Sequence, residues 1–214
     1  MKYHFDHLAL KPALFYAADY GIRFEIALPG TAHKDPRNLR QIEERTTAIF
    51  NHVFQDSDEL LVITDVHCEK KDTFLQKRAT NVFKKYMKSK RILTKLQHAA
   101  LPSLIWDKED EEYEDMVTHR FVLPCQKRDV RYRQLLVALS YKDFSHPTQI
   151  LKHNCHAGYN IYFINVTKKI IYHLYDDRGC DVVATSANDL RTLYEECNDW
   201  ILDYDRAQID RIYI

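Results

Sequence analysis

Apolar and polar residues alternate in several short segments of the chain. In residues 21–28 the apolar side chains occupy every second position, and Arg23 and Glu25 lie between them, which is the period of two that a half-buried strand requires. Similar runs, rich in β-branched and aromatic residues, predict further strands at 58–67, 117–125, 159–166, 169–175 and 180–184. The last three runs are joined by short turns and therefore predict a three-strand meander.

Other segments repeat their apolar residues every three or four positions, as amphipathic helices do. Asp35 and Pro36 suit the N-cap and the first turn of a helix that extends to about Val53. The same spacing predicts helices at 72–88, 129–141 and 187–202, the last with a break near Asn198. We expect the segment after it to be a tail that packs through Tyr204, Ile209 and Ile212.

The order of these elements favours an α+β fold. Strands and helices alternate at first, but three consecutive strands near the end do not fit a doubly wound parallel sheet. We therefore expect one mixed, mostly antiparallel sheet of about six strands, with a C-terminal three-strand meander and with helices packed on it. A length of 214 residues suits one domain, and we assign 1–214 to a single α+β domain.

Charge is unevenly distributed, although the chain has no formal net charge. Lys and Arg number 31, as do Asp and Glu, and this balance argues against a dedicated nucleic-acid binder. Residues 69–99, however, carry ten basic and two acidic side chains, and residues 107–115 carry seven acidic side chains and one lysine. We interpret 69–115 as a charged insertion or flexible excursion. Its basic helix, 77–95, is where a nucleic acid would bind.

Several common functional motifs are absent from the sequence. The four glycines allow neither a P-loop, nor a dinucleotide-binding fingerprint, nor a nucleophile elbow. His153, Cys155 and His156 form the densest group of metal-ligand types, and His67 with Cys68 is a second, but neither has the spacing of a zinc site. We therefore expect no metal and no cofactor, and we assign no catalytic residue.

The sequence also indicates where the protein resides. No apolar run approaches the roughly 20 residues of a membrane helix, and the polar start of the chain does not resemble a signal peptide. Five scattered cysteines without a C-x-x-C pair are typical of reduced thiols. We expect a cytoplasmic protein that does not bind membranes.

Carboxylates and arginines concentrate in three parts of the chain. One pair lies on the first strand, a second group lies in the turn at 176–181, and a third follows the last predicted helix. Such groups bind polar ligands or act as acid and base, but they also form ion pairs that are only structural. The sequence leaves both interpretations open. The residues of this candidate binding cluster are Arg23, Glu25, Asp176, Asp177, Arg178, Asp181, Asp203, Asp205 and Arg206.

The same three segments resemble a known family. They are the runs GIRFE at 21–25, YDDRG at 175–179 with Asp181, and NDWILDYDR at 198–206. Together they are similar to a bacterial family of uncharacterised proteins, domain of unknown function 3885, and the resemblance covers nearly the whole chain. It implies a small cytosolic bacterial protein and brings no activity, cofactor or catalytic residue.

Two classes of function fit these observations. We favour a non-enzymatic protein-binding module, such as an immunity protein that neutralises a toxin, because catalytic motifs are missing, the charge blocks are opposite and 14 tyrosines suit interfaces. The alternative is an enzyme or small-ligand-binding protein with an acid/Arg site at the 176–181 hairpin. It requires the polar residues to converge in a concave pocket rather than pair with one another. Nucleic-acid binding through 77–95 is a weaker alternative.

Overall fold

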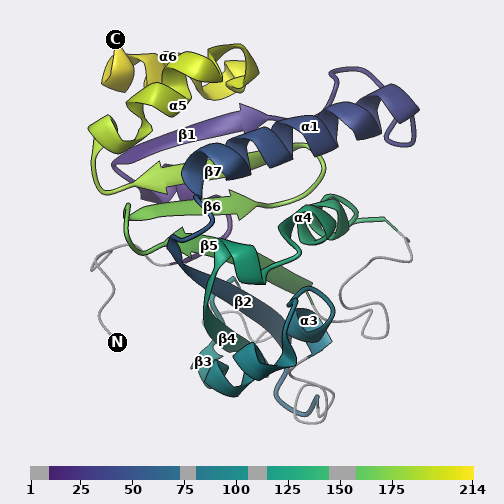
Figure 1. Cartoon of the computed structure of the whole chain (residues 1–214). Helices are drawn as coiled ribbons and strands as arrows, with labels where there is room; N and C mark the ends of the chain where they lie inside the picture. Colours follow the sequence, from purple (N-terminus) through teal and green to yellow (C-terminus); the bar gives the residue numbers. More distant parts are fainter. Residues whose placement is uncertain (1–9, 73–80, 106–114, 145–157) are drawn as a thin grey trace.

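The computed structural model describes residues 10–72, 81–105, 115–144 and 158–214 (Figure 1). Within these ranges a single sheet has the strand order β1-β7-β6-β5-β2-β4-β3, and every neighbouring pair is antiparallel. Its strands are β1 (Tyr20–Glu25), β2 (Glu59–Glu69), β3 (Gln97–Pro102), β4 (Met116–Gln126), β5 (Gly158–Asn165), β6 (Ile170–Leu174) and β7 (Gly179–Ala184). The α+β class and the β5–β6–β7 meander are confirmed. The sheet has seven strands rather than about six, and it contains no parallel pair among the described strands.

The additional strand, β3, lies inside the segment that we interpreted as a charged insertion. It pairs with β4, and Leu101 stands opposite Thr118. Five of its six residues are exposed, because β3 is the last strand of the sheet order. A strand without a buried face has no hydrophobic alternation to reveal it in the sequence.

The α-helices of the described residues lie on one face of the sheet and at one edge (Figure 1), whereas the 3-10 helix η1 (Leu14–Ala17) packs on the other face. The α-helices are α1 (Pro36–Val53), α3 (Asn81–Lys84), α4 (Tyr132–Ser140), α5 (Arg191–Glu196) and α6 (Asp203–Tyr213), and the other 3-10 helices are η2 (Lys90–Lys95), η4 (Lys127–Asp129), η5 (Ala187–Leu190) and η6 (Asn198–Trp200). Asp35 caps α1 as expected, since its carboxylate accepts a hydrogen bond from the backbone N–H of Arg37 at 2.8 Å. No helix in the described ranges is long and apolar enough to cross a membrane.

Two helix predictions need correction. Within the predicted helix 72–88, residues 73–80 lie outside the described residues, and α3 ends at Lys84 because Met87 forms a β-bridge with Val130. The predicted tail is the helix α6. Ile209 is buried as expected, but Tyr204 is 85% exposed, because the buried face of α6 repeats every four residues from Asp205.

The main core lies between one face of the sheet and the helices α1 and α4. Phe50 of α1 is central to it, with its ring centroid 5.1 Å from that of Phe163 on β5 and 5.5 Å from that of Tyr172 on β6. In Figure 1, α1 and α4 lie in front of the sheet, and α5 and α6 lie beyond the edge formed by β1.

The opposite face of the sheet is apolar at one end and polar at the other. Leu61 and Ile63 of β2 pack there with Leu14 of η1. Further along the same strand the residues on that face are Asp65 and His67, which are both 1% exposed. Buried polar side chains therefore follow directly on an apolar cluster, and the candidate cluster lies at this polar end.

Candidate functional site

The three segments that suggested a site meet at β1. Arg23 of β1 stands opposite Asp181 of β7 in the antiparallel register. On the outer side of β1, the backbone N–H of Leu202 donates a 2.9 Å hydrogen bond to the carbonyl oxygen of Arg23. The turn between β6 and β7 is attached in the same way, through a 2.9 Å bond from Ile26 N–H to the carbonyl of Arg178. Residues far apart in the sequence thus form one region.

Arg23 and Asp181 form a buried bidentate ion pair. Nε donates to Oδ1 at 2.7 Å and Nη2 donates to Oδ2 at 3.0 Å, and the two residues are 9% and 0% exposed. Burial by itself lowers the pKa of Arg23, but the hydrogen bonds and charge of Asp181 outweigh it, so that the pKa is raised. The guanidinium is therefore charged in the folded protein.

The ion pair with Asp181 uses Nε and Nη2 of Arg23 and leaves Nη1 without a hydrogen bond to Asp181. The guanidinium carbon lies 4.5 Å from the ring centroid of Tyr16 and 5.5 Å from that of Tyr175. Nη1 lies 3.8 Å from Oδ2 of Asp205, which is too long for a hydrogen bond. Nη1 makes no hydrogen bond to any described residue, and it remains available as a donor.

Arg23 lines a cavity of about 860 Å³ at the polar end of the sheet, a volume within the usual range for small-molecule sites. Arg23, Lys142 and Arg178 contribute three cations, and three carboxylates balance them. The polar side chains around the cavity are Arg23, Glu25, His67, Lys142, Asp143, Tyr159, Asn160, Tyr175, Asp176 and Arg178.

The β6–β7 turn sends its two aspartates in different directions. Asp176 accepts hydrogen bonds from the backbone N–H and the Nε of Arg178 at 2.8 and 2.9 Å, and both residues line the cavity. Asp177 instead has Oδ2 3.0 Å from Nδ1 of His33 and does not line the cavity. The Arg178 side chain is 76% exposed and keeps Nη1 free of the described residues.

Gly179 follows the turn and is required there for space. A Cβ at this position would lie 2.6 Å from the carbonyl oxygen of Phe24 and would also collide with the hydroxyl of Tyr175. Its φ is not positive, since Gly30 is the described glycine with that conformation. The close approach of β1 and Tyr175 explains Gly179 instead.

A chain of hydrogen bonds runs from the cavity into the sheet. Nζ of Lys142 donates to Oδ1 of Asn160 at 3.3 Å, so the amide nitrogen of Asn160 faces Nε2 of His67, 3.1 Å away. His67 Nε2 must then accept, and its Nδ1–H points to Oγ1 of Thr118 at 2.9 Å. Burial, with the charges of Lys142 and Arg120, lowers the pKa of His67 to about 4, in agreement with a neutral ring.

Sequence reasoning missed Lys142 and Asn160. Lys142 follows α4 and stands beside Asp143, which makes it look like an ordinary surface lysine. Burial lowers its pKa, although Asp143 and Asp176 oppose the effect. The nearest signal in the sequence was His67, which we considered as a metal ligand with Cys68.

In the described residues no group of three His, Cys, Asp or Glu side chains could hold a metal, and His153, Cys155 and His156 lie outside those residues.

The C-terminal members of the cluster lie outside the cavity lining. Asp205 is 4% exposed and accepts a 3.0 Å hydrogen bond from the hydroxyl of Tyr16. Arg206 donates from Nη1 to the side chain of Asn198 at 3.0 Å, and Asp203 has a side chain that is 97% exposed. Asp177, Asp181 and these three residues do not line the cavity.

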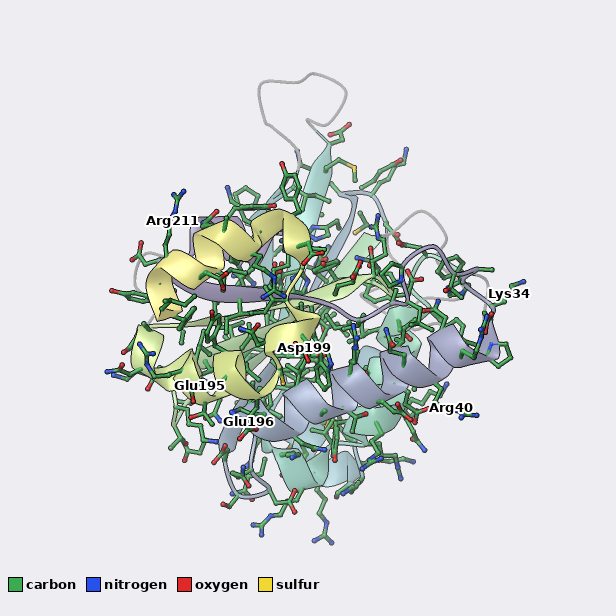
Figure 2. All side chains as sticks on the ribbon, turned by 90° about the horizontal axis from the view of Figure 1, so that it is seen from above. Lys34, Arg40, Glu195, Glu196, Asp199 and Arg211 are labelled. Carbon is green, nitrogen blue, oxygen red and sulfur yellow. The ribbon has the colours of Figure 1, made fainter. Side chains whose placement is uncertain are left out.

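Charged side chains elsewhere on the described surface mix both signs. Figure 2, seen from above, shows Arg40 of α1, Glu195 of α5 and Arg211 of α6 pointing outward from the helices. The basic segment 77–95 is described from residue 81 onward, and its cations are exposed on and beside α3 and η2: Lys84, Lys85, Lys88, Lys90, Arg91 and Lys95.

The fold and the cavity together define an α+β protein with an open antiparallel sheet and a charge-balanced polar cavity at one end of it. Comparison with known families identifies the group. The profile of the domain of unknown function 3885 matches residues 1–205, and the chain belongs to this family. It is 31% identical over 210 residues to the uncharacterized protein YnaE of Bacillus subtilis (strain 168), and the match covers 94% of each chain. No solved structure matches.

Proposed function

We propose that the protein binds a small polar molecule in the cavity at the polar end of the sheet. The observation that carries this proposal is that Arg23, Glu25, Asp176 and Arg178, which come from two distant segments, line one cavity together with Lys142. Structural ion pairs alone would not require a cavity of about 860 Å³ beside them.

Some polar groups around the cavity make no hydrogen bond to the described residues, and these groups also support binding. Arg23 and Arg178 each use one edge of the guanidinium on an aspartate, and Nη1 of each makes no hydrogen bond to a described residue. The carboxylate of Glu25 likewise has no hydrogen bond or ion pair with the described residues. Donors and an acceptor thus remain for a ligand, as small-molecule sites require.

A ligand screen tests the proposal. A library of polar metabolites is screened by thermal shift, and each hit is measured by calorimetry against Glu25→Gln, Arg178→Ala and the control Glu44→Gln, which changes an exposed carboxylate of α1. We expect hits whose affinity falls by about tenfold or more in the two cavity variants and stays unchanged in the control. A screen without hits, or hits that ignore the cavity variants, would contradict the proposal.

A protein partner, such as a toxin that an immunity protein neutralises, is the second candidate. Tyr16 and Tyr204 flank Asp205, and they are 54% and 85% exposed. Exposed tyrosines favour an interface, and the four free cysteines of the described residues support a cytoplasmic location. A partner found by co-purification should lose affinity in Tyr16→Ala and Tyr204→Ala but not in Glu25→Gln. The reverse order would favour the cavity.

A further inference from the structure

We propose that the ligand is a small zwitterion, such as a free amino acid, whose ammonium group binds Glu25 and whose carboxylate binds Lys142 and Nη1 of Arg23. This inference rests on the proposed function, since it concerns the same cavity. Among the charged lining groups, Arg23 and Arg178 are paired with aspartates, whereas the carboxylate of Glu25 has no hydrogen bond or ion pair with the described residues.

The balance of charge disfavours a strongly anionic ligand. Arg178 is paired with Asp176 within the cavity wall, and Arg23 is paired with Asp181 behind it. A polyphosphate would have to compete with these carboxylates for the same guanidinium groups. A ligand with one positive and one negative group leaves the pairs intact and keeps the buried charge balanced.

Glu25 supplies the negative end of the site. It lies two residues after Arg23, so the two side chains share one face of β1 at the cavity. Its backbone is fixed, because Nη1 of Arg45 donates to the Glu25 carbonyl oxygen at 2.8 Å. The carboxylate itself has no hydrogen bond or ion pair with the described residues. Its oxygens are therefore available to an ammonium group, although the charge of Arg45 also acts on this carboxylate.

Lys142 supplies the positive end. The hydrogen bond to Asn160 positions its Nζ, and Asn160 in turn cannot rotate without breaking its contact with His67. The ring of Tyr159, with its centroid 5.5 Å from Nζ, borders the ammonium group from another side. Because burial lowers the pKa of Lys142, a bound carboxylate would raise that pKa again, and binding would take up protons as the pH approaches it.

The experiment uses pairs of analogues. The full-length protein is titrated by calorimetry with the proteinogenic amino acids. Each one that binds is then compared with the amine that lacks its carboxylate and with the acid that lacks its amino group. We expect both analogues to bind about tenfold or more weakly. In alkaline solution the measured heat should depend on the ionisation enthalpy of the buffer, because Lys142 takes up protons.

Two variants assign the two ends. Glu25→Gln should lower the affinity for the amino acid about tenfold but leave the affinity for the deaminated acid unchanged. Lys142→Met should also lower the affinity for the amino acid about tenfold but leave the affinity for the decarboxylated amine unchanged. Glu44→Gln and Lys84→Met, on exposed positions of α1 and α3, are the matched controls.

The outcomes separate this inference from the one before it. Binding of an uncharged polyol or nucleoside in the cavity, with no amino acid bound, would overturn the zwitterion and leave the proposed function standing. Amino-acid binding that neither variant weakens would overturn the assignment to Glu25 and Lys142. Failure of every metabolite to bind would overturn both proposals.

Discussion

Two arginine–aspartate pairs, each with a buried aspartate, lie on the same face of the sheet and differ in what surrounds them. Arg23 and Asp181 join β1 to β7, and Arg120 and Asp65 join β4 to β2. The second pair is as well formed as the first, with Nε and Nη2 of Arg120 donating to Asp65 at 2.7 and 2.6 Å. Arg23 lines the cavity, whereas neither member of the second pair does.

Each pair also has a buried histidine beside it. His67 follows Asp65 on β2 and hydrogen bonds with Thr118 and Asn160. His173 stands opposite Asp181, is fully buried, and has no hydrogen-bond partner for either ring nitrogen among the described residues. The comparison teaches that a buried ion pair does not mark a site. What distinguishes the Arg23 pair is the cavity that Arg23 lines.

Acid should weaken both halves of this face strongly. Burial lowers the pKa of His67 to about 4 and that of His173 to about 3, from an ordinary value near 6.5. The unfolded chain therefore binds more protons than the folded one below about pH 6.5. Above that pH the two histidines do not change the free energy of unfolding. Below it, each histidine lowers the free energy of unfolding by about 1.4 kcal/mol per pH unit, down to about pH 4. Denaturant titrations across this range measure the slope.

Replacing each histidine separates the two halves. His173→Phe should reduce the slope by about 1.4 kcal/mol per pH unit without loss of stability at neutral pH, because the new ring keeps the contact with Tyr162. His67→Phe should reduce the slope equally but cost about 1–3 kcal/mol at neutral pH, since Asn160 and Thr118 lose their partner. An equal loss of stability at neutral pH in His67→Phe and His173→Phe would contradict the expected difference between the two histidines.

The ion pairs themselves should differ in their contribution to stability. Asp181→Ala should lower the free energy of unfolding by about 3–5 kcal/mol, because Arg23 remains buried without its partner and the backbone N–H of Phe15 loses an acceptor. Asp65→Ala should cost less, since the Arg120 side chain is 23% exposed, against 11% for Arg23, and can reach water. Equilibrium unfolding in urea compares them. A larger loss in Asp65→Ala would reverse this ranking.

Gly179→Ala should have a smaller effect, confined to the cavity half. The added Cβ must displace Tyr175 and the carbonyl of Phe24, which costs about 1–3 kcal/mol by analogy with overpacked cores. Gly158→Ala is the matched control at the start of β5, where a Cβ would meet nothing within 4 Å, and it should stay within about 0.5 kcal/mol of the parent. Thermal unfolding compares the two variants. Similar shifts of the unfolding temperature in both would argue against a close approach of Phe24 and Tyr175 to Gly179.

The sequence predicted elements well where one face of an element is buried. Alternation was sufficient for β1, and the Asp35 cap for the start of α1, whereas β5, with seven of its eight residues buried, was recognised by its β-branched and aromatic residues. β3 escaped prediction because both of its faces are largely exposed. Tyr204 was misplaced for a related reason, since a tail and a helix direct the same residues to different sides.

The site was predictable only in part. Dense groups of acids and arginines drew attention to Arg23 and Asp176, but nothing local distinguishes Asp176 from Asp177, and the turn geometry alone separates them. Lys142 and Asn160 belong to different elements that meet through tertiary packing. A lone lysine or asparagine carries no pattern, so a pair of this kind becomes visible only in three dimensions.

The pairing of β1 with β7 has a consequence for biosynthesis. The hydrogen bonds between Arg23 and Asp181 span 158 positions of sequence, and contacts of such high contact order form late and slowly. On the ribosome, β1 is made well before β7 and has no partner strand until the long segment between them has been synthesised. A fragment that stops before Gly179 has neither β7 nor a completed cavity. The cavity is therefore complete only after residues as far as Leu202, which also line it, have been synthesised.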